Sequence, residues 1–431
     1  MLSPYFCRKY KTMQLKRFTL ISGAFLLLLG ACKESSHSSK EASSLPEGAK
    51  FLDPANMDTT VRAGDNFYMY VNGSWLKNTP IPASETSWGS FNLLDEFNLK
   101  ALKGLMEEAA ATKGASKGSP EQMVGDMFAS GMDTMAIEKE GLAGIQPELD
   151  KINSITSPAM LVDELARRTA IGLNPLFAFY VGPDDKNVSK NICNLFQGGL
   201  GLPDRDYYLK QEPKETKIRE QYVQHIAAML KLSGESEADA AKHAQTIMAM
   251  ETGLAKVSMD RVAMRDPYLL YNKFSLADFS KKTTGMNWVD LFAKMNVSRQ
   301  DSMIVAQPAF MTYVADLIAK APLEDWKVYL KWHALSDMAS YLPKAFDLEH
   351  FNFYGKVLRG QQEQRPRWKR VLQVVDGSVG EQLGKMYTDK YFTADAKKRM
   401  LELVDNLQKV YEERINKLDW MSDSTKVKAK E

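Results

Sequence analysis

Residues 394–417, ADAKKRMLELVDNLQKVYEERINK, carry the clearest structural signal in the chain. Apolar side chains recur three or four positions apart in this stretch, at Met400, Leu403, Val404, Leu407, Tyr411 and Ile415. Lysine, arginine and glutamate fill many of the other positions. This spacing is that of an amphipathic helix, and Thr393 is a favourable residue to cap its start. The stretch therefore predicts a long helix with one apolar face.

The same periodicity recurs towards the N-terminus and predicts further helices. They are expected just after Asp65, which is the predicted cap of the first, over 91–109, after Ser119-Pro120, after Ser157-Pro158, over 217–232 and over 238–255. Residues 119–122 (SPEQ) have the pattern of a capping box, with proline at the first helical position. Strand signals are few, and the best are Leu176–Val181 and Val371–Val375. The expected fold class is mainly α with minor β.

The composition excludes two classes of protein. The chain has 431 residues, with 56 Lys and Arg against 54 Asp and Glu, and its net charge of +2 lacks the basic surplus typical of nucleic-acid binding. Hydrophobic residues at 44% and charged residues at 26% are ordinary for globular proteins and exclude wholesale disorder. Three cysteines do not make a disulfide framework. We therefore expect a globular protein of roughly two to three domains and no nucleic-acid partner.

The N-terminus has the features of a targeting segment. A Lys-Arg pair at 16–17 precedes an apolar run over 18–31, which is shorter than the roughly 20 residues of a bilayer-spanning helix. A basic start, a short apolar centre and small residues at the end describe a signal peptide. Its last residues, 29–32 (LGAC), resemble the bacterial lipoprotein signal, in which the cysteine becomes the lipidated N-terminus. Lipidation is thus expected at Cys32.

This interpretation places the protein in the bacterial cell envelope. Residues 1–32 are the expected lipoprotein signal peptide, with Met13 as an alternative start of translation. Lys33 is not the aspartate that often retains lipoproteins in the inner membrane, so the outer membrane is favoured, on either face. Residues 33–60 begin with a run rich in Ser, Lys and Glu, which has little apolar surface to bury and predicts a flexible tether. The globular part is expected to span 61–431.

The sequence lacks the common metal-binding motifs. None of the five histidines is followed by glutamate, so the zinc-binding pattern H-E-x-x-H does not occur, and no two histidines lie four residues apart. Cys193 is the one cysteine beyond the signal segment, so the sequence offers no thiolate cluster for a metal. His333 lies in an apolar helical stretch and is interpreted as a core histidine. The sequence therefore predicts no catalytic residue and no metal ligand in this chain.

Two further stretches have ordinary structural interpretations. Residues 197–208, QGGLGLPDRDYY, contain glycines but lack both the spacing of a dinucleotide-binding loop and the lysine of a phosphate-binding loop. We interpret them as a tight, irregular loop with Tyr207 and Tyr208 packed inward. Residues 365–370, RPRWKR, are interpreted as a solvated helix start in preference to an anion site.

Four ordered motifs resemble those of one protein family. They are residues 65–76 (DNFYMYVNGSWL) with Ile81-Pro82 and 88–91 (WGSF), residues 197–208, residues 265–272 (RDPYLLYN), and residues 367–370 (RWKR) through 380–384 (GEQLG). From about residue 61 to its last residue, the chain is similar to the N-terminal region of the neprilysin and endothelin-converting-enzyme family of zinc metallopeptidases.

The resemblance implies a fold and a place for the chemistry. The family has two largely helical lobes around a cavity, and 61–431 would form most of the multi-helix non-catalytic lobe, which restricts access to peptides. Zinc, the H-E-x-x-H helix and the general base belong to the catalytic domain that follows in the family. The helical pattern at 422–431 has no terminating Gly or Asn, which favours a chain truncated before that domain. Zinc is therefore expected in the full-length relative and no cofactor in this chain.

Three positions depart from the pattern of the mammalian members of the family. In neprilysin-type members, an arginine two positions before the motif glycine binds the terminal carboxylate of the substrate, and Ser87 is aligned with it here. An aligned aspartate and a second arginine fall at Asn92 and Asp95. The resemblance thus makes Ser87, Asn92 and Asp95 candidate substrate contacts without the carboxylate grip, which fits endopeptidase-like handling of longer peptides. The alternative for these residues is an ordinary role on the helix surface.

Three functional hypotheses remain open. In the first, the chain is the N-terminal part of a zinc metalloendopeptidase that acts on oligopeptides, and it is inactive alone. In the second, it is a non-catalytic lipoprotein that binds peptides. In the third, it is one half of a split peptidase. The expected partners are accordingly peptide substrates, the missing catalytic domain or a separate catalytic chain, and the membrane through the lipid anchor.

Overall fold

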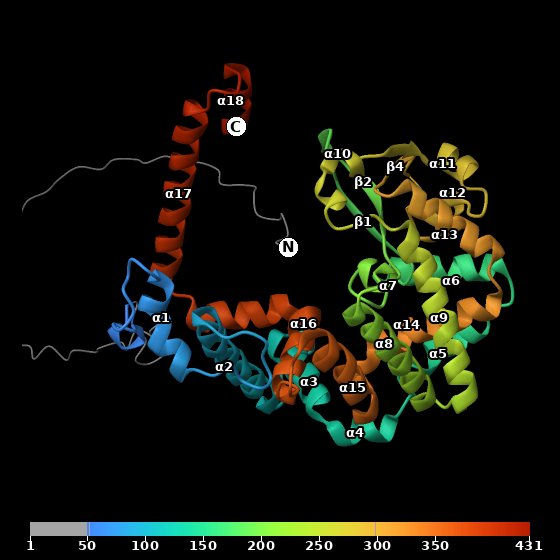
Figure 1. Ribbon diagram of the computed structural model, residues 1–431, viewed down its shortest axis with the longest axis horizontal. Coiled ribbons are helices and arrows are strands. Elements are labelled where there is room, and N and C mark those ends of the chain that lie inside the picture. Colours follow the sequence, from blue (N-terminus) through green and yellow to red (C-terminus); the bar gives the residue numbers. More distant parts are fainter. Residues whose placement is uncertain (1–49, 51, 298) are drawn as a thin grey trace, which may run out of the picture. The chain divides into compact units, whose positions relative to one another are not determined.

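The structure of the chain is a computed structural model that describes residue 50, residues 52–297 and residues 299–431 (Figure 1). The expected signal peptide 1–32, its lipidation site Cys32 and residues 33–49 of the expected tether lie outside the described residues. The described end of the tether contains a short 3-10 turn at Pro54–Asn56.

The described chain is mainly helical, as the sequence predicts. The first helices are α1 (Phe67–Asn78), α2 (Ser90–Ala111), α3 (Pro120–Met132), α4 (Thr134–Glu140), α5 (Gln146–Asn153), α6 (Pro158–Ala170), α7 (Asp206–Leu209), α8 (Pro213–Leu232) and α9 (Glu237–Val257). The later helices are α10 (Pro267–Leu270), α11 (Leu276–Lys282), α12 (Trp288–Lys294), α13 (Pro308–Lys320), α14 (Leu323–Met338), α15 (Lys344–His350), α16 (Arg367–Tyr391), α17 (Ala394–Lys417) and α18 (Asp423–Lys430). Two 3-10 turns (Ala263–Arg265 and Ala339–Tyr341) and a π-helix (Phe351–Arg359) complete the helical part.

Polar side chains cap several helix starts, as local sequence predicts. The Ser119 hydroxyl accepts a hydrogen bond from the backbone N–H of Gln122 (3.2 Å), and the Gln122 side chain accepts one from the N–H of Gly118 (2.9 Å). The capping box at 119–122 is therefore confirmed, with its return bond made one residue earlier in the chain. At α17, Thr393 accepts a hydrogen bond from Ala396 N (3.1 Å), which fixes the predicted start of that helix.

The cap of α1 is not the predicted one. The side chain of Asn66 accepts a hydrogen bond from Met69 N (3.0 Å) and caps the helix, whereas Asp65 lies one residue earlier and pairs with Arg62 at 3.6 Å. The prediction of Asp65 was wrong by one residue, because both residue types are good caps and the chain enters the helix at Phe67.

A small mixed sheet supplies the β content. Its strands are β1 (Phe177–Asp184), β2 (Asn187–Gln197), β3 (Lys273–Ser275) and β4 (Ser302–Val305), in the order β1-β2-β4-β3. β1 and β2 form an antiparallel hairpin, β2 and β4 are parallel, and β3 and β4 are antiparallel. The strand predicted at Leu176–Val181 is confirmed as the beginning of β1.

Most of the buried apolar side chains form one large core that helices from α5 to α15 share with the sheet (Figure 1). Trp288, Trp326, Trp332, Tyr222 and Tyr329 are fully buried in it. Close packing of this kind fixes the elements that carry the candidate site described below.

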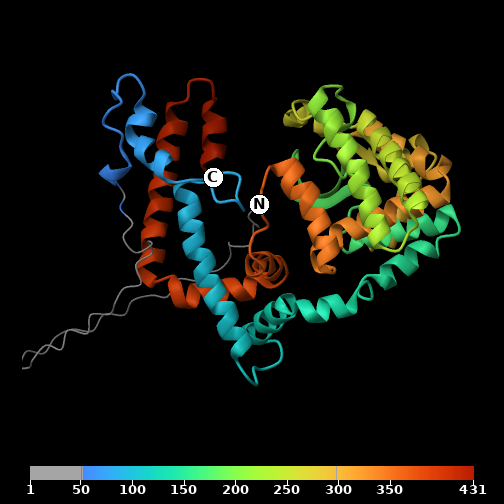
Figure 2. The same ribbon diagram turned by 60° about the horizontal axis from the view of Figure 1, so that its bottom comes forward.

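A second core lies between α2, α3 and α16, which contact one another (Figures 1 and 2). Leu105, Val124, Val375 and Leu383 are buried there. A Cβ atom placed on Gly125 of α3 would lie 2.6 Å from the carbonyl oxygen of Ala109 of α2, so only glycine allows this approach of the two helices.

The strand predicted at Val371–Val375 was wrong. These residues lie in α16, where Val371, Leu372 and Val375 point into the second core at helical spacing. A five-residue apolar run matches a buried strand and a buried helix equally well, and the partners across the core decide between them.

α17 begins and ends at the predicted residues, but its apolar face is exposed. Met400, Leu403, Val404, Leu407 and Tyr411 have exposed fractions of 51, 50, 42, 51 and 65%. Among the described elements, α18 is the one against which α17 packs substantially. Within the described ranges we find no helix whose length and hydropathy would let it cross a bilayer.

Candidate functional site

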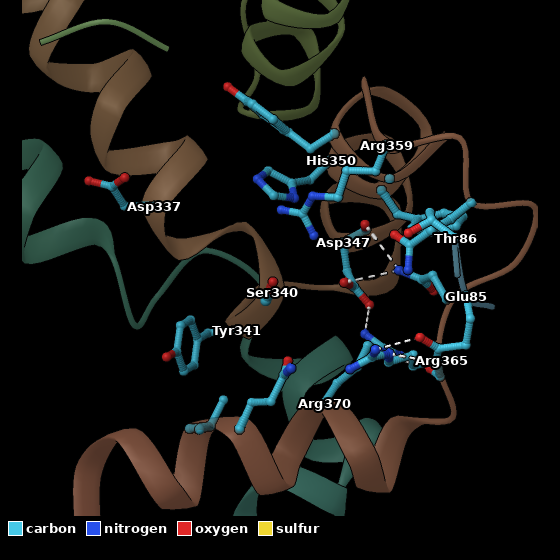
Figure 3. A pocket seen from close by; sticks show the side chains of 17 residues that line it. Glu85, Thr86, Asp337, Ser340, Tyr341, Asp347, His350, Arg359, Arg365 and Arg370 are labelled. Atoms are coloured by element: carbon cyan, nitrogen blue, oxygen red, sulfur yellow. Dashed lines mark hydrogen bonds and ion pairs between the residues drawn. The ribbon is translucent and has the colours of Figure 1, made fainter. Parts of the chain in front are cut away.

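A cavity of about 570 Å³ lies where the segment from the end of α14 to the start of α16 meets the residues before α2 (Figure 3). α15, the π-helix and the loop 360–366 supply most of its wall, and Glu85 and Thr86 close one side. The loop is held in place because the backbone N–H groups of Gln362 and Glu363 both donate to the carbonyl oxygen of Ala83 (2.9 and 3.1 Å).

Two ion pairs form one side of the cavity. The guanidinium of Arg365 donates from Nε and Nη2 to the two carboxylate oxygens of Glu85 (2.8 and 2.5 Å), a bidentate arrangement that raises the pKa of Arg365. Arg370 pairs with Asp347, which also accepts a hydrogen bond from the Gln364 side chain (3.2 Å). These contacts neutralise four charges. The Arg365 pair joins the loop before α16 to the segment before α2, and the Arg370 pair joins α16 to α15.

The basic run 365–370 is therefore a helix start, as predicted, but not a solvated one. Arg365 and Arg370 pair with carboxylates from Glu85 and Asp347, and Lys369 pairs with Glu96 of α2. The sequence showed the cations but not their partners, which come from distant parts of the chain.

Two other charged side chains face the same cavity without such a partner. Arg359 is the last residue of the π-helix, and its guanidinium makes no hydrogen bond or ion pair among the described residues; Figure 3 shows it beside the imidazole of His350. Burial, together with repulsion from His225 and Arg359, lowers the pKa of His350 to about 4. His350 is thus neutral near pH 7. Asp337, near the end of α14, is the second charged side chain and lies across the cavity in Figure 3.

A smaller cavity of about 330 Å³ adjoins the first and shares Asp337, Ser340, His350 and Tyr354 with it. The Gly-rich loop predicted at 197–208 contributes Leu200 and Gly201 to its wall.

The Gly-rich loop is anchored by a buried carboxylate. Glu251 of α9 is fully buried and accepts hydrogen bonds from the hydroxyl groups of Tyr208 (2.7 Å) and Tyr222 (2.9 Å). Tyr208 in turn accepts a hydrogen bond from the backbone N–H of Leu202 (2.9 Å), so the predicted inward packing of Tyr208 is confirmed. A Cβ atom on Gly201 would lie 1.9 Å from the Tyr222 hydroxyl oxygen, so the close approach of the loop requires glycine.

The histidines near the two cavities do not form a zinc site. His225 Nδ1 lies 2.9 Å from Glu349 Oε1, and its ring stacks on Phe353. His333 is buried, as predicted, and its Nε2 lies 3.4 Å from Glu251 without the geometry of a hydrogen bond. In the described part of the chain no three His, Cys, Asp or Glu side chains are grouped as a metal would require. The described residues therefore do not fit a zinc ion.

The predicted substrate contacts follow Glu85 and Thr86 closely in the sequence, but they do not line the cavity. Ser87 follows Thr86 in the loop before α2, and Asn92 and Asp95 lie in the first turns of that helix. Ser87 and Asp95 are exposed and Asn92 is half-buried. Their contact with substrate stays a prediction. No sequence motif marked Arg359 or Asp337, which the fold brings to the cavity from the ends of two separate helices.

Comparison with known proteins places the chain in a family. It is 28% identical over 387 residues to endothelin-converting enzyme 1 of Mus musculus, covering 87% of this chain and 50% of that protein. Neprilysin-3 of Drosophila melanogaster is 26% identical over 395 residues, again with 87% and 50% covered. The chain thus spans about half the length of the curated relatives that it matches.

A solved structure agrees with these relatives. The zinc metalloprotease ZMP1 of Mycobacterium tuberculosis, in complex with an inhibitor, superposes with a TM-score of 0.79 at 33% identity, over 88% of this chain and 57% of that one. Residues 63–431 match the model described as "Peptidase family M13". The chain belongs to peptidase family M13.

Proposed function

We propose that this chain is the N-terminal part of a zinc metalloendopeptidase that hydrolyses oligopeptides, and that it forms the lobe that encloses and restricts the substrate cavity. The match to the family over 63–431 carries this proposal, since it includes almost the whole described chain. Relatives named endothelin-converting enzyme and zinc metalloprotease support peptide cleavage and zinc as the chemistry of the complete protein.

We propose further that these 431 residues alone do not cleave peptides. The sequence has no H-E-x-x-H pattern, and the described residues contain no group of side chains suited to a metal. Zinc and the general base would come from the catalytic domain that the sequence resemblance implies.

The exposed face of α17 supports a catalytic partner. A row of large apolar side chains on one helix is ordinarily buried against another element, because its exposure to water is unfavourable. Leu403, Leu407 and Tyr411 make such a row here, with about half or more of each side chain exposed. We assign this face to the catalytic domain, either continuous with this chain or supplied by a separate chain in a split peptidase.

Zinc content and peptidase activity of the purified chain test the proposal. We expect no stoichiometric zinc by elemental analysis and no cleavage of a quenched fluorescent peptide. Activity should appear when the chain is extended by, or mixed with, a catalytic part that contains H-E-x-x-H. Cleavage by the 431-residue chain that a chelator abolishes and zinc restores would refute the proposal.

We also propose that the protein is a lipoprotein anchored at Cys32 to the bacterial cell envelope, with the outer membrane favoured. This rests on the sequence of the N-terminal segment alone.

A further inference from the structure

The charges around the 570 Å³ cavity do not cancel locally. Glu85 pairs with Arg365, and Asp347 pairs with Arg370. Arg359 and Asp337 remain, and neither forms an ion pair within the described ranges. One unpaired cation and one unpaired anion thus face the same polar space from different elements (Figure 3).

Arg359 is suited to a carboxylate. Its guanidinium presents several N–H donors in one plane, and no described residue accepts from them. The neighbouring His350 is neutral near pH 7, and therefore Arg359 is the available positive charge on this side of the cavity.

Asp337 is suited to an ammonium group. Desolvation by the surrounding protein raises the pKa of its carboxyl group, while the positive field of His333 and Arg168 acts in the opposite direction without making an ion pair. Its carboxylate lines the cavity and makes no hydrogen bond or ion pair among the described residues, so it is open to a cation.

We propose that the cavity binds a short peptide with both ends free, with its terminal carboxylate on Arg359 and its terminal ammonium group on Asp337. The cavity volume of about 570 Å³ lies within the range of small-ligand sites, ~300–1,000 Å³. Ser340, Gln361 and Gln373 line it and offer hydrogen bonds to peptide groups between the two ends. The choice of a peptide over another zwitterion rests on the proposed function, but binding here needs neither zinc nor cleavage.

Titration calorimetry of the intact chain with trialanine and its blocked forms tests the site. We expect trialanine to bind, and N-acetylation or C-terminal amidation to weaken binding about tenfold or more each, since each removes a charge-assisted contact. Arg359→Gln should weaken trialanine binding to the same extent and abolish the effect of amidation. Asp337→Asn should likewise abolish the effect of N-acetylation.

Arg399→Gln and Asp405→Asn are matched controls on the exposed surface of α17, and they should leave all affinities unchanged. Equal binding of free and amidated trialanine, or unchanged binding to Arg359→Gln, would overturn the proposal, as would no binding of trialanine at millimolar concentration. If a variant does not fold by circular dichroism, the blocked peptides on the unmodified chain still decide. A negative result here leaves the zinc and peptidase experiment unaffected, so the two proposals fail separately.

Discussion

At the scale of single residues, the fold decides which charged groups are paired and which face a cavity unpaired. Arg365 and Arg359 lie six positions apart in the sequence, yet the first is held by Glu85 and the second has no described partner. Glu85 lies 280 positions from Arg365 in the chain, so no local pattern could reveal this pair. The basic run at 365–370 was visible in the sequence, but its role depends on tertiary contacts.

Acidification should destabilise the protein through His350. Its folded pKa of about 4 lies below the ordinary value of 6.5, so the unfolded chain takes up a proton first as the pH falls. The stability that depends on neutral His350 is fully present above about pH 6.5, and it is lost as the pH falls towards 4. Between pH 7 and pH 5 this group should lower the free energy of unfolding by about 1–2 kcal/mol. Denaturant unfolding at several pH values measures it.

His350→Gln should remove that part of the pH dependence, while the lowered pKa of His225 preserves a further loss of the same sign. His243→Gln serves as a control, because His243 bonds to Glu235 and does not line either cavity. Identical pH profiles for His350→Gln and the unmodified chain would contradict the assignment.

At the scale of elements, the length of a periodic pattern determines how well it predicts structure. The pattern over 394–417 runs for many turns, and α17 has the predicted bounds. The apolar run at 371–375 is too short to distinguish a period of 2 from one of 3.6, and it was wrongly assigned to a strand. Helix caps were predicted to within one residue because they depend on neighbouring side chains alone.

Polar substitutions on the exposed face of α17 should have different effects in this chain alone and in the presence of the proposed catalytic part. Leu403→Gln with Leu407→Gln should hardly change the unfolding free energy of the 431-residue chain, because both side chains are already about half exposed. Leu383→Ala in the second core should cost about 2–5 kcal/mol, since Leu383 is 1% exposed. Thermal unfolding compares the two.

In a preparation that includes the catalytic part, the same double substitution should be strongly destabilising or should prevent association. If the double variant destabilises the chain alone as much as Leu383→Ala does, the face is already buried and the assigned partner is wrong.

At the scale of the whole molecule, the family resemblance and the fold class were predictable, and the candidate cavity was not. Ordered motifs identified the family because each covers several fixed positions, such as 197–208, where glycine is needed beside Tyr222. The cavity arises where the segment linking α14 to α16 meets residues 85–86, which only the folded chain brings together.

The localisation of the protein in the cell is also a property of the whole molecule. Cys32→Ser should abolish incorporation of a labelled fatty acid and move the protein from the membrane fraction to the soluble fraction of the producing bacterium. Cys193→Ser is the control and should change neither, because Cys193 is buried on β2 and burial raises the pKa of its thiol to about 11. Equal labelling of the Cys32→Ser protein would exclude lipidation at that residue.

The π-helix Phe351–Arg359 has a consequence for how this site changes in evolution. A π-helical turn contains more residues than an α-helical one, because its hydrogen bonds join residues five apart. Losing one residue would let the segment wind as an α-helix and would swing the side chains that follow by about 100° around its axis. Arg359, the last residue of the segment, would then turn away from the cavity. A change of chain length in this segment would therefore remove the guanidinium from the proposed site with Arg359 still encoded.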